Sequence, residues 1–262
     1  MALVTINDGQ AIGYDEAGEA PKTPIIFLHG VGSDRSVWLR QLVHFGHERR
    51  AIAFDYPGYG DSDPVPEETT RDDYAAAMLA AMSQLGVYRA HICGLSLGGV
   101  VAIAMHDAAP ERCASLVLAD TFAVHPDGRA IYERSLAGSS DMRVLADSRV
   151  DVLLAQPAEP AVRNEVVRTM SGIDPEAYKI GARAVWLADQ RERASAIRVP
   201  TLVLCGSQDR VTPPALSHVL AQAIPGAQQG VIEGAGHLGN IEKPAEFDTL
   251  VGAFIRGVDS RC

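Results

Sequence analysis

The chain has 262 residues, of which 47% are hydrophobic, and its formal net charge is −10 at pH 7. A chain of this length could form one large α/β domain or two small ones, and its hydrophobic share is enough for a sizeable core. The acidic balance argues against a nucleic-acid partner or an anionic membrane surface. No apolar run reaches the roughly 18 residues of a membrane span, so we expect no membrane association.

The first residues and the four cysteines bear on the cellular compartment. Residues 1–9 lack a basic start followed by a long apolar stretch, so we expect no signal peptide. Cys93 and Cys205 lie in apolar, strand-like runs and are predicted to be buried, whereas Cys113 and Cys262 have no assigned role. Without paired spacings, the cysteines favour reduced thiols and a cytoplasmic location.

Strand-like and helix-like segments alternate along most of the chain. Residues Leu3–Ile6 and Gln10–Asp15 flank Asn7-Asp8-Gly9, which predicts a hairpin because Asp-Gly tolerates positive φ. Aliphatic runs then predict six more strands: Ile25–Leu28, Ala51–Phe54, Ala90–Cys93, Leu116–Ala119, Thr201–Cys205 and Gly230–Glu233. Helix-like stretches are Ser36–Phe45, Asp72–Leu85, Gly98–Ala109, Pro214–Ala223 and Ala245–Arg256. Continuous apolar runs are typical of parallel strands, so we expect an eight-stranded, mostly parallel sheet with helices on both faces.

Residues 121–199, after the sixth strand, interrupt this alternation. They contain no convincing strand and four helix-like stretches, at Gly128–Leu136, Met142–Leu154, Ala161–Met170 and Glu176–Ala188. A long helical insertion after a strand predicts a lid over an active site. The predicted organisation is therefore a core formed by residues 1–120 and 200–262 and a lid formed by residues 121–199.

The segment Gly94-Leu95-Ser96-Leu97-Gly98-Gly99 carries the most informative motif. It lies between a predicted strand and a predicted helix. Gly-x-Ser-x-Gly in this context is the nucleophile elbow, a turn so sharp that the serine is strained and its hydroxyl is presented to a substrate. The flanking glycines avoid collisions between a Cβ atom and the neighbouring strand and helix. Ser96 is therefore the predicted nucleophile.

A serine nucleophile needs a base to take its proton and an acid to orient that base. His237 follows a glycine-rich approach at the carboxyl end of a predicted strand, where ligands bind in open α/β sheets, and is the predicted base. In the chain order Ser, Asp, His, the best-fitting acid is Asp209, at another strand end. Asp120, after Leu116–Ala119, is the second candidate for the acid.

The negative oxygen of a tetrahedral intermediate needs fixed donors. His29-Gly30-Val31-Gly32 ends a predicted strand, and its glycines let the backbone approach a substrate. We assign the two donors to the backbone N–H groups of Val31 and Leu97, with His29 bracing the loop. The glycine spacing fits neither of the common nucleotide phosphate-binding motifs.

Together these segments resemble the α/β-hydrolase superfamily. The resemblance rests on segments that span nearly the whole chain outside the predicted lid: His29-Gly30-x-Gly32, Asp55-Tyr56-Pro57-Gly58-Tyr59-Gly60-x-Ser62, Gly94–Gly99, Gly206-x-x-Asp209 and Gly236-His237. Asp209-Arg210-Val211-Thr212-Pro213-Pro214 and Trp186 further resemble the 3-oxoadipate enol-lactonase-like hydrolases and small carboxylesterases. Those lactonases tend to lack the His-Gly-x-Gly form, which leaves the substrate open. Serine at position 96 argues against haloalkane dehalogenases and epoxide hydrolases, which use aspartate there.

Large side chains on the strand-end loops and the lid are candidates for the pocket walls: Trp38, Phe122, His125 and Trp186. They could instead serve only to pack the lid against the core. A lactone with a free carboxylate would also need a cation, for which Arg134 and Arg143 are candidates without an assignment. No metal or organic cofactor is expected.

The resulting hypothesis is a serine hydrolase acting on a small carboxylic ester or lactone through an acyl-enzyme. Two further activities could use the same residues. The first is that of a lyase or a haloperoxidase-like perhydrolase, and the second is that of a ligand-sensing protein that turns over slowly. The sequence predicts neither the physiological substrate nor the oligomeric state.

Overall fold

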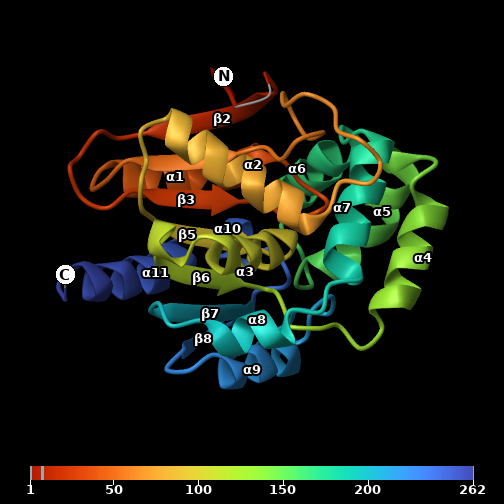
Figure 1. Cartoon of the computed structure of the whole chain (residues 1–262). Coiled ribbons are helices and arrows are strands. Elements are labelled where there is room, and N and C mark those ends of the chain that lie inside the picture. The colour runs from red at the N-terminus through yellow and green to blue at the C-terminus, as the bar shows by residue number, and fades with distance from the viewer. Residues whose placement is uncertain (1, 7–8, 262) are drawn as a thin grey trace.

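An eight-stranded sheet runs through the molecule (Figure 1). The computed structural model describes residues 2–6 and 9–261. The strands are β1 (Ala2–Thr5), β2 (Ala11–Ala17), β3 (Ile25–Leu28), β4 (Ala51–Phe54), β5 (Ala90–Leu95), β6 (Cys113–Ala119), β7 (Thr201–Gly206) and β8 (Gln228–Ile232). Their order is β1-β2-β4-β3-β5-β6-β7-β8. Only the β1–β2 and β2–β4 pairs are antiparallel, which confirms the expected mostly parallel sheet.

Helices cover both faces of the sheet. On one face α2 (Arg71–Gln84), α3 (Leu97–Ala108), α8 (Arg191–Ala196) and α9 (Pro214–Ala223) pack side by side in that order. On the other face α1 (Leu39–Gly46) packs against α11 (Pro244–Asp259), which also contacts the short α10 (Gly239–Glu242). Residues in β3 to β7 are buried because these helices exclude water from both sides.

Four further helices lie together at one end of the sheet, away from the C-terminus (Figure 1). They are α4 (Gly128–Gly138), α5 (Met142–Leu153), α6 (Pro160–Ser171) and α7 (Pro175–Trp186), and we call them the lid helices for their position. Local sequence explains where two of them begin, since Asp141 and Asp174 each accept two backbone N–H groups at the start of α5 and α7. Helix α8 packs instead against α3 and α9, with the core.

Successive strands β4 and β5 lie on opposite sides of β3 in the sheet. The chain first moves outward from β3 to β4 and then returns to β5 on the other side of β3. The loops that leave β3 and β5 therefore separate at the carboxyl edge of the sheet and leave a crevice, the usual ligand position in such folds. None of the helices in the described part of the chain combines the length and the apolar character that crossing a bilayer requires.

Most differences from the expected elements concern ends and short pieces. Residues Asn7 and Asp8 of the predicted hairpin turn lie outside the described residues, while Gly9 has the expected positive φ of 86°. The strand predicted at Leu116–Ala119 begins earlier, at Cys113. Cys93, Cys113 and Cys205 are buried free thiols, and Cys262 lies outside the described residues. Short helices α8 and α10 were not expected, because four to six residues carry too little periodicity.

Candidate active site

Ser96 lies between β5 and α3, in the strand–turn–helix context that the motif predicts. Its φ and ψ are 55° and −112°, an unusual conformation for a residue with a side chain, which costs on the order of 1–3 kcal/mol. Two hydrogen bonds from the end of β6 hold the turn: the Ser96 N–H donates to Ala119 O (2.9 Å), and Thr121 Oγ1 donates to Ser96 O (2.9 Å). Ser96 Oγ is buried and has no hydrogen-bond partner among the described residues.

The glycines of this turn are required by close backbone approaches. A Cβ on Gly94 would overlap the Gly98 carbonyl, and a Cβ on Gly98 would overlap the carbonyl of Leu28 in β3. A Cβ on Gly99 would lie 2.5 Å from the Thr121 side chain. The turn is therefore as tight as the motif implies, because any larger residue would push the strand and helix apart.

The loop after β3 faces this turn. A Cβ on Gly30 would lie 3.5 Å from Ser96 Cβ, so the loop and the serine are in direct contact. The N–H groups of Val31 and Leu97 have no hydrogen-bond partner in residues 2–6 and 9–261, which leaves two donors free for a substrate oxygen. His29 is buried between Tyr56 and Tyr59, and Tyr56 donates to the His29 carbonyl (3.2 Å), in keeping with a bracing role.

His237 and Asp209 meet at the same edge of the sheet. Nδ1–H of His237 donates to Asp209 Oδ2 over 2.8 Å, and Thr212 Oγ1 donates to the same oxygen over 2.6 Å. The other carboxylate oxygen accepts the N–H groups of Val211 (2.7 Å) and Thr212 (3.0 Å). Burial alone would raise the pKa of Asp209, but His237 and the Thr212 hydrogen bonds outweigh burial and lower it to about 2.

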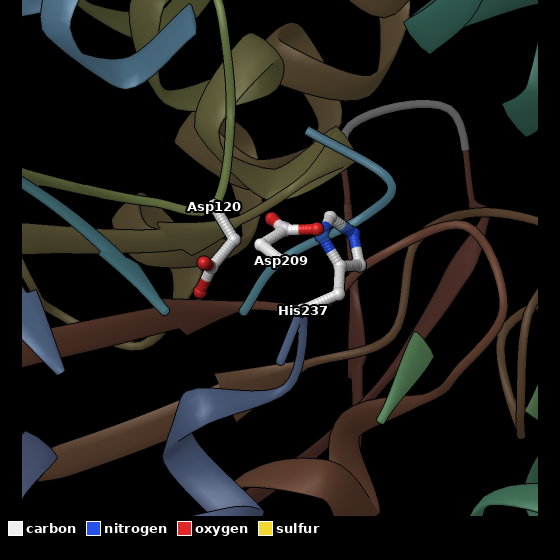
Figure 2. Close-up of side chains that lie close together, drawn as sticks. All are labelled: Asp120, Asp209 and His237. Carbon is white, nitrogen blue, oxygen red and sulfur yellow. Dashed lines mark hydrogen bonds and ion pairs between the residues drawn. The ribbon is translucent and has the colours of Figure 1, made fainter. Parts of the chain in front are cut away.

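Asp120, the second candidate for the acid, lies on the far side of Asp209 from the imidazole (Figure 2). One carboxyl oxygen accepts the Gly206 N–H over 2.8 Å, and the other has no hydrogen-bond partner among the described residues. Burial and the nearby Asp209 carboxylate raise the pKa of Asp120 well above its usual range. One carboxyl oxygen each of Asp120 and Asp209 and one ring nitrogen of His237 lie within 4.8 Å of one another. Because Asp209 already accepts four hydrogen bonds, its carboxylate has little capacity left to ligate a metal ion.

A cavity at the carboxyl edge of the sheet is lined by Ser96, by His237 and by residues of the lid helices. Its floor includes the β3 loop and Leu95, and its roof comes from α5, α6 and α7. Most lining side chains are apolar: Val31, Val37, Leu95, Leu153, Val166, Met170, Trp186, Val211, Leu238 and Ile241. This lining suits a small substrate with an apolar body.

Of the four predicted wall residues, Trp186 lines the cavity. Phe122 stacks on Trp186 with ring centroids 5.8 Å apart, and His125 meets the same ring edge-on at 5.6 Å. Phe122 and His125 are absent from the lining and support Trp186 from behind. His125 accepts the Asp127 N–H at Nδ1 and donates from Nε2 to Val211 O (3.3 Å), so it is neutral in this packing role.

The prediction for Trp38 is wrong. Its ring is fully buried, stacked on Phe27 at 4.9 Å between centroids and tilted against Phe247 at 5.8 Å. Trp38 therefore packs between the sheet and α11, and its neighbour Val37 lines the cavity instead. The sequence alone could not tell which of Val37 and Trp38 faces the cavity, because a 3-10 turn ends at Trp38 and α1 begins directly after it.

The cavity cation is Arg149, not Arg134 or Arg143. Arg149 is half-buried and has no hydrogen-bond or ion-pair partner among the described residues, whereas the exposed Arg143 pairs with Asp147. Burial raises the pKa of Tyr178, another lining residue, and the Arg149 guanidinium opposes that shift, so the charge lies close to the cavity. Glu165 also lines the cavity, but Arg40 binds it through two hydrogen bonds of 2.9 and 2.7 Å.

Known proteins are similar to this chain in sequence and in fold. The alpha/beta hydrolase family matches residues 25–249. The 3-oxoadipate enol-lactonase 1 of Acinetobacter baylyi is 26% identical over 260 residues, covering 98% of this chain and 97% of the relative. Among solved structures, the enol-lactonase from Burkholderia xenovorans LB400 has a TM-score of 0.91 at 27% identity, with 97% and 100% of the two chains covered. A thermophilic esterase from Thermogutta terrifontis has a TM-score of 0.89 at 26% identity, covering 98% of each chain. This chain belongs to the alpha/beta hydrolase family.

Proposed function

We propose that the protein is a serine hydrolase that cleaves a small carboxylic ester or lactone through an acyl-enzyme. The observation that carries the proposal is one cavity that contains both the strained Ser96 and His237, with His237 hydrogen-bonded to Asp209. A strained serine, a base and an orienting acid are the parts that nucleophilic catalysis at a carbonyl needs.

The proposed reaction has two halves. His237 accepts the Ser96 proton as the serine oxygen attacks the acyl carbonyl, and the N–H groups of Val31 and Leu97 stabilise the resulting oxyanion. His237 then gives that proton to the leaving alkoxide, which leaves an acyl-enzyme. In the second half, His237 takes a proton from water as the water oxygen attacks the acyl carbon. His237 then gives that proton to Ser96 Oγ as the bond between Oγ and the acyl carbon breaks, which releases the acid and restores the free serine. Asp209 keeps the imidazole oriented and offsets its transient positive charge.

The cavity supports a substrate that combines an apolar body with an acid group. Apolar side chains make up most of the lining, and Arg149 is the lining cation without a carboxylate partner in the described residues. Two of the similar proteins are named enol-lactonases, and 3-oxoadipate in one of those names is a dicarboxylate. In this proposal the lid is narrower than the expected residues 121–199, because α8 packs with the core. Helices α4 to α7 form the lid, and α5, α6 and α7 supply the roof of the cavity.

Replacing the nucleophile tests the proposal directly. Ser96→Ala should lower turnover of p-nitrophenyl acetate on the order of 10⁶-fold and abolish labelling by a fluorophosphonate. Near-normal turnover by this variant would reject the assignment. In the unaltered protein, a burst of one product equivalent without further turnover would favour ligand sensing. Peroxide-dependent halogenation would favour a perhydrolase, and cyanide release from cyanohydrins would favour a lyase.

A further inference from the structure

The backbone on either side of His237 is held by a single carboxylate. Glu242, the last residue of α10, accepts the Gly236 N–H over 2.9 Å and the Leu238 N–H over 3.3 Å, both at Oε1. These two residues flank His237 in the loop between β8 and α10. The position of the imidazole therefore depends on where Glu242 places this oxygen.

The other oxygen of the same carboxylate reaches the lid. Glu242 Oε2 accepts the N–H of Ala155, two residues after the end of α5, over 2.7 Å. The lid also contacts His237 directly, because the His237 N–H donates to Leu153 O over 2.7 Å. Leu153 in turn lines the cavity. Segment Leu153–Ala155 thus faces a substrate on one side and the histidine loop on the other.

Two further contacts bring this segment against the site. A Cβ on Gly236 would lie 2.6 Å from Ala155 N and 2.7 Å from Leu153 O, so only glycine permits the approach. Arg210, next to Asp209, donates to the carbonyls of Asp151 and Leu154. The loops that carry the predicted base and the predicted acid are therefore fastened to the same end of α5.

The charge of Glu242 also acts on the site. Burial raises the pKa of this carboxyl above its usual range, although the hydrogen bonds from Ala155, Leu238 and Gly236 and the charge of His237 oppose the shift. A carboxylate at this position stabilises an imidazolium, the form that His237 takes while it holds the serine proton.

We propose that Glu242 is a positioning residue that couples lid segment Leu153–Ala155 to the imidazole of His237. Contact between a substrate and Leu153 is transmitted through this carboxylate to the base. On this view the carboxyl end of α5 helps to hold His237 in position and does not move independently of it. The inference rests on the proposed function, since it assigns a role relative to His237 as the base.

Glu242→Gln is the sharpest test, because the amide has a similar shape but only one acceptor oxygen. Whichever way it turns, its NH₂ group faces either Ala155 N–H or the two N–H groups beside His237. We expect kcat for an ester to fall on the order of 10²-fold with KM unchanged. The acidic limb of the kcat/KM pH profile should move to lower pH, because a negative charge near the imidazolium is lost. The matched control is Glu246→Gln, an exposed residue in the first turn of α11, which should leave both unchanged.

A second variant separates the hydrogen bond from the charge. Ala155→Pro removes the N–H donor while Glu242 keeps its charge, and Leu154 already has the extended conformation (φ −103°, ψ 148°) that precedes proline. We expect kcat to fall while the acidic limb stays in place. Hydrogen exchange should accelerate in both the α5–α6 loop and the β8–α10 loop of this variant, since each holds the other.

Several outcomes would overturn the coupling. Glu242→Gln could match Glu246→Gln in kcat and pH profile, or it could lose only stability without moving the acidic limb. If Glu242→Gln does not fold, Ala155→Pro decides: faster exchange in the α5–α6 loop alone, with normal kcat, would reject the proposal. Failure of the proposed function is distinguishable, because only then would Ser96→Ala retain turnover.

Discussion

The two buried carboxyl groups near His237 illustrate how neighbours decide the chemistry of single residues. Asp209 accepts four hydrogen bonds, which together with His237 hold its pKa at about 2 in spite of burial. Asp120 accepts one, and burial raises its pKa. An imidazolium needs an ionised partner, so these environments favour Asp209 as the acid and leave Asp120 a neutral supporting group.

Substituting each carboxyl group separately tests this division. Asp209→Asn should lower kcat on the order of 10⁴-fold, because an amide fixes the wrong imidazole tautomer. Asp120→Asn should have a much smaller effect, since its amide oxygen can still accept the Gly206 N–H. Turnover of one ester by both variants at one pH provides the measurement. The reverse ranking would move the acid to the end of β6.

Secondary structure elements differ in how far sequence predicts them. The strands predicted at Ile25–Leu28 and Ala51–Phe54 coincide with β3 and β4, because an aliphatic run bounded by turn residues is a local signal. Lid helices α5 and α7 were also expected within a few residues of their bounds. Which of their side chains face the cavity was not predictable, since the lid helices pack against one another, as α5 does against α6, and α7 also contacts α2 and α3.

Arg149 in helix α5 is expected to bind an acid group of the substrate. Arg149→Ala should raise KM at least tenfold for an ester that carries a carboxylate, because a charge-assisted contact contributes about 1.5–3 kcal/mol. KM for a neutral ester of similar size should not change. Arg143→Ala, on the same helix but exposed and paired with Asp147, is the matched control. Equal effects on the charged and the neutral ester would argue against a role of Arg149 in binding an acid group.

Another buried histidine lies in a polar cluster at the opposite ends of the strands. His91, at the start of β5, contacts Ser115 Oγ (2.7 Å) and Asp259 Oδ1 (3.1 Å), and Arg49 pairs with the same Asp259 (2.9 Å). These contacts fasten the end of α11 to the sheet. Burial lowers the pKa of His91 to about 4, although the Asp259 charge opposes the shift.

This cluster predicts how stability depends on pH. The folded pKa of His91 is about 4 and the ordinary value is 6.5, so below pH 6.5 the unfolded chain binds a proton that the folded chain does not. The free energy of unfolding should therefore fall as pH drops from 6.5 towards 4, by about 1.4 kcal/mol for each unit of pKa difference. Denaturant titrations at several pH values measure this effect. In His91→Gln the free energy of unfolding should depend less steeply on pH than in the unaltered protein. His47→Gln, at an exposed position after α1, should keep the wild-type slope.

Local signals account for what the sequence alone determined: the mostly parallel sheet, the serine turn between β5 and α3, and the placement of His237 and Asp209 at strand ends. These follow from short runs of neighbouring residues and from the rule that parallel strands end at one edge. Tertiary structure decided that Trp38 packs in the core, that Arg149 is the cavity cation and that Glu242 joins the lid to the histidine loop. Those contacts join residues far apart in the chain through helix packing, whose angles are not set by any single segment.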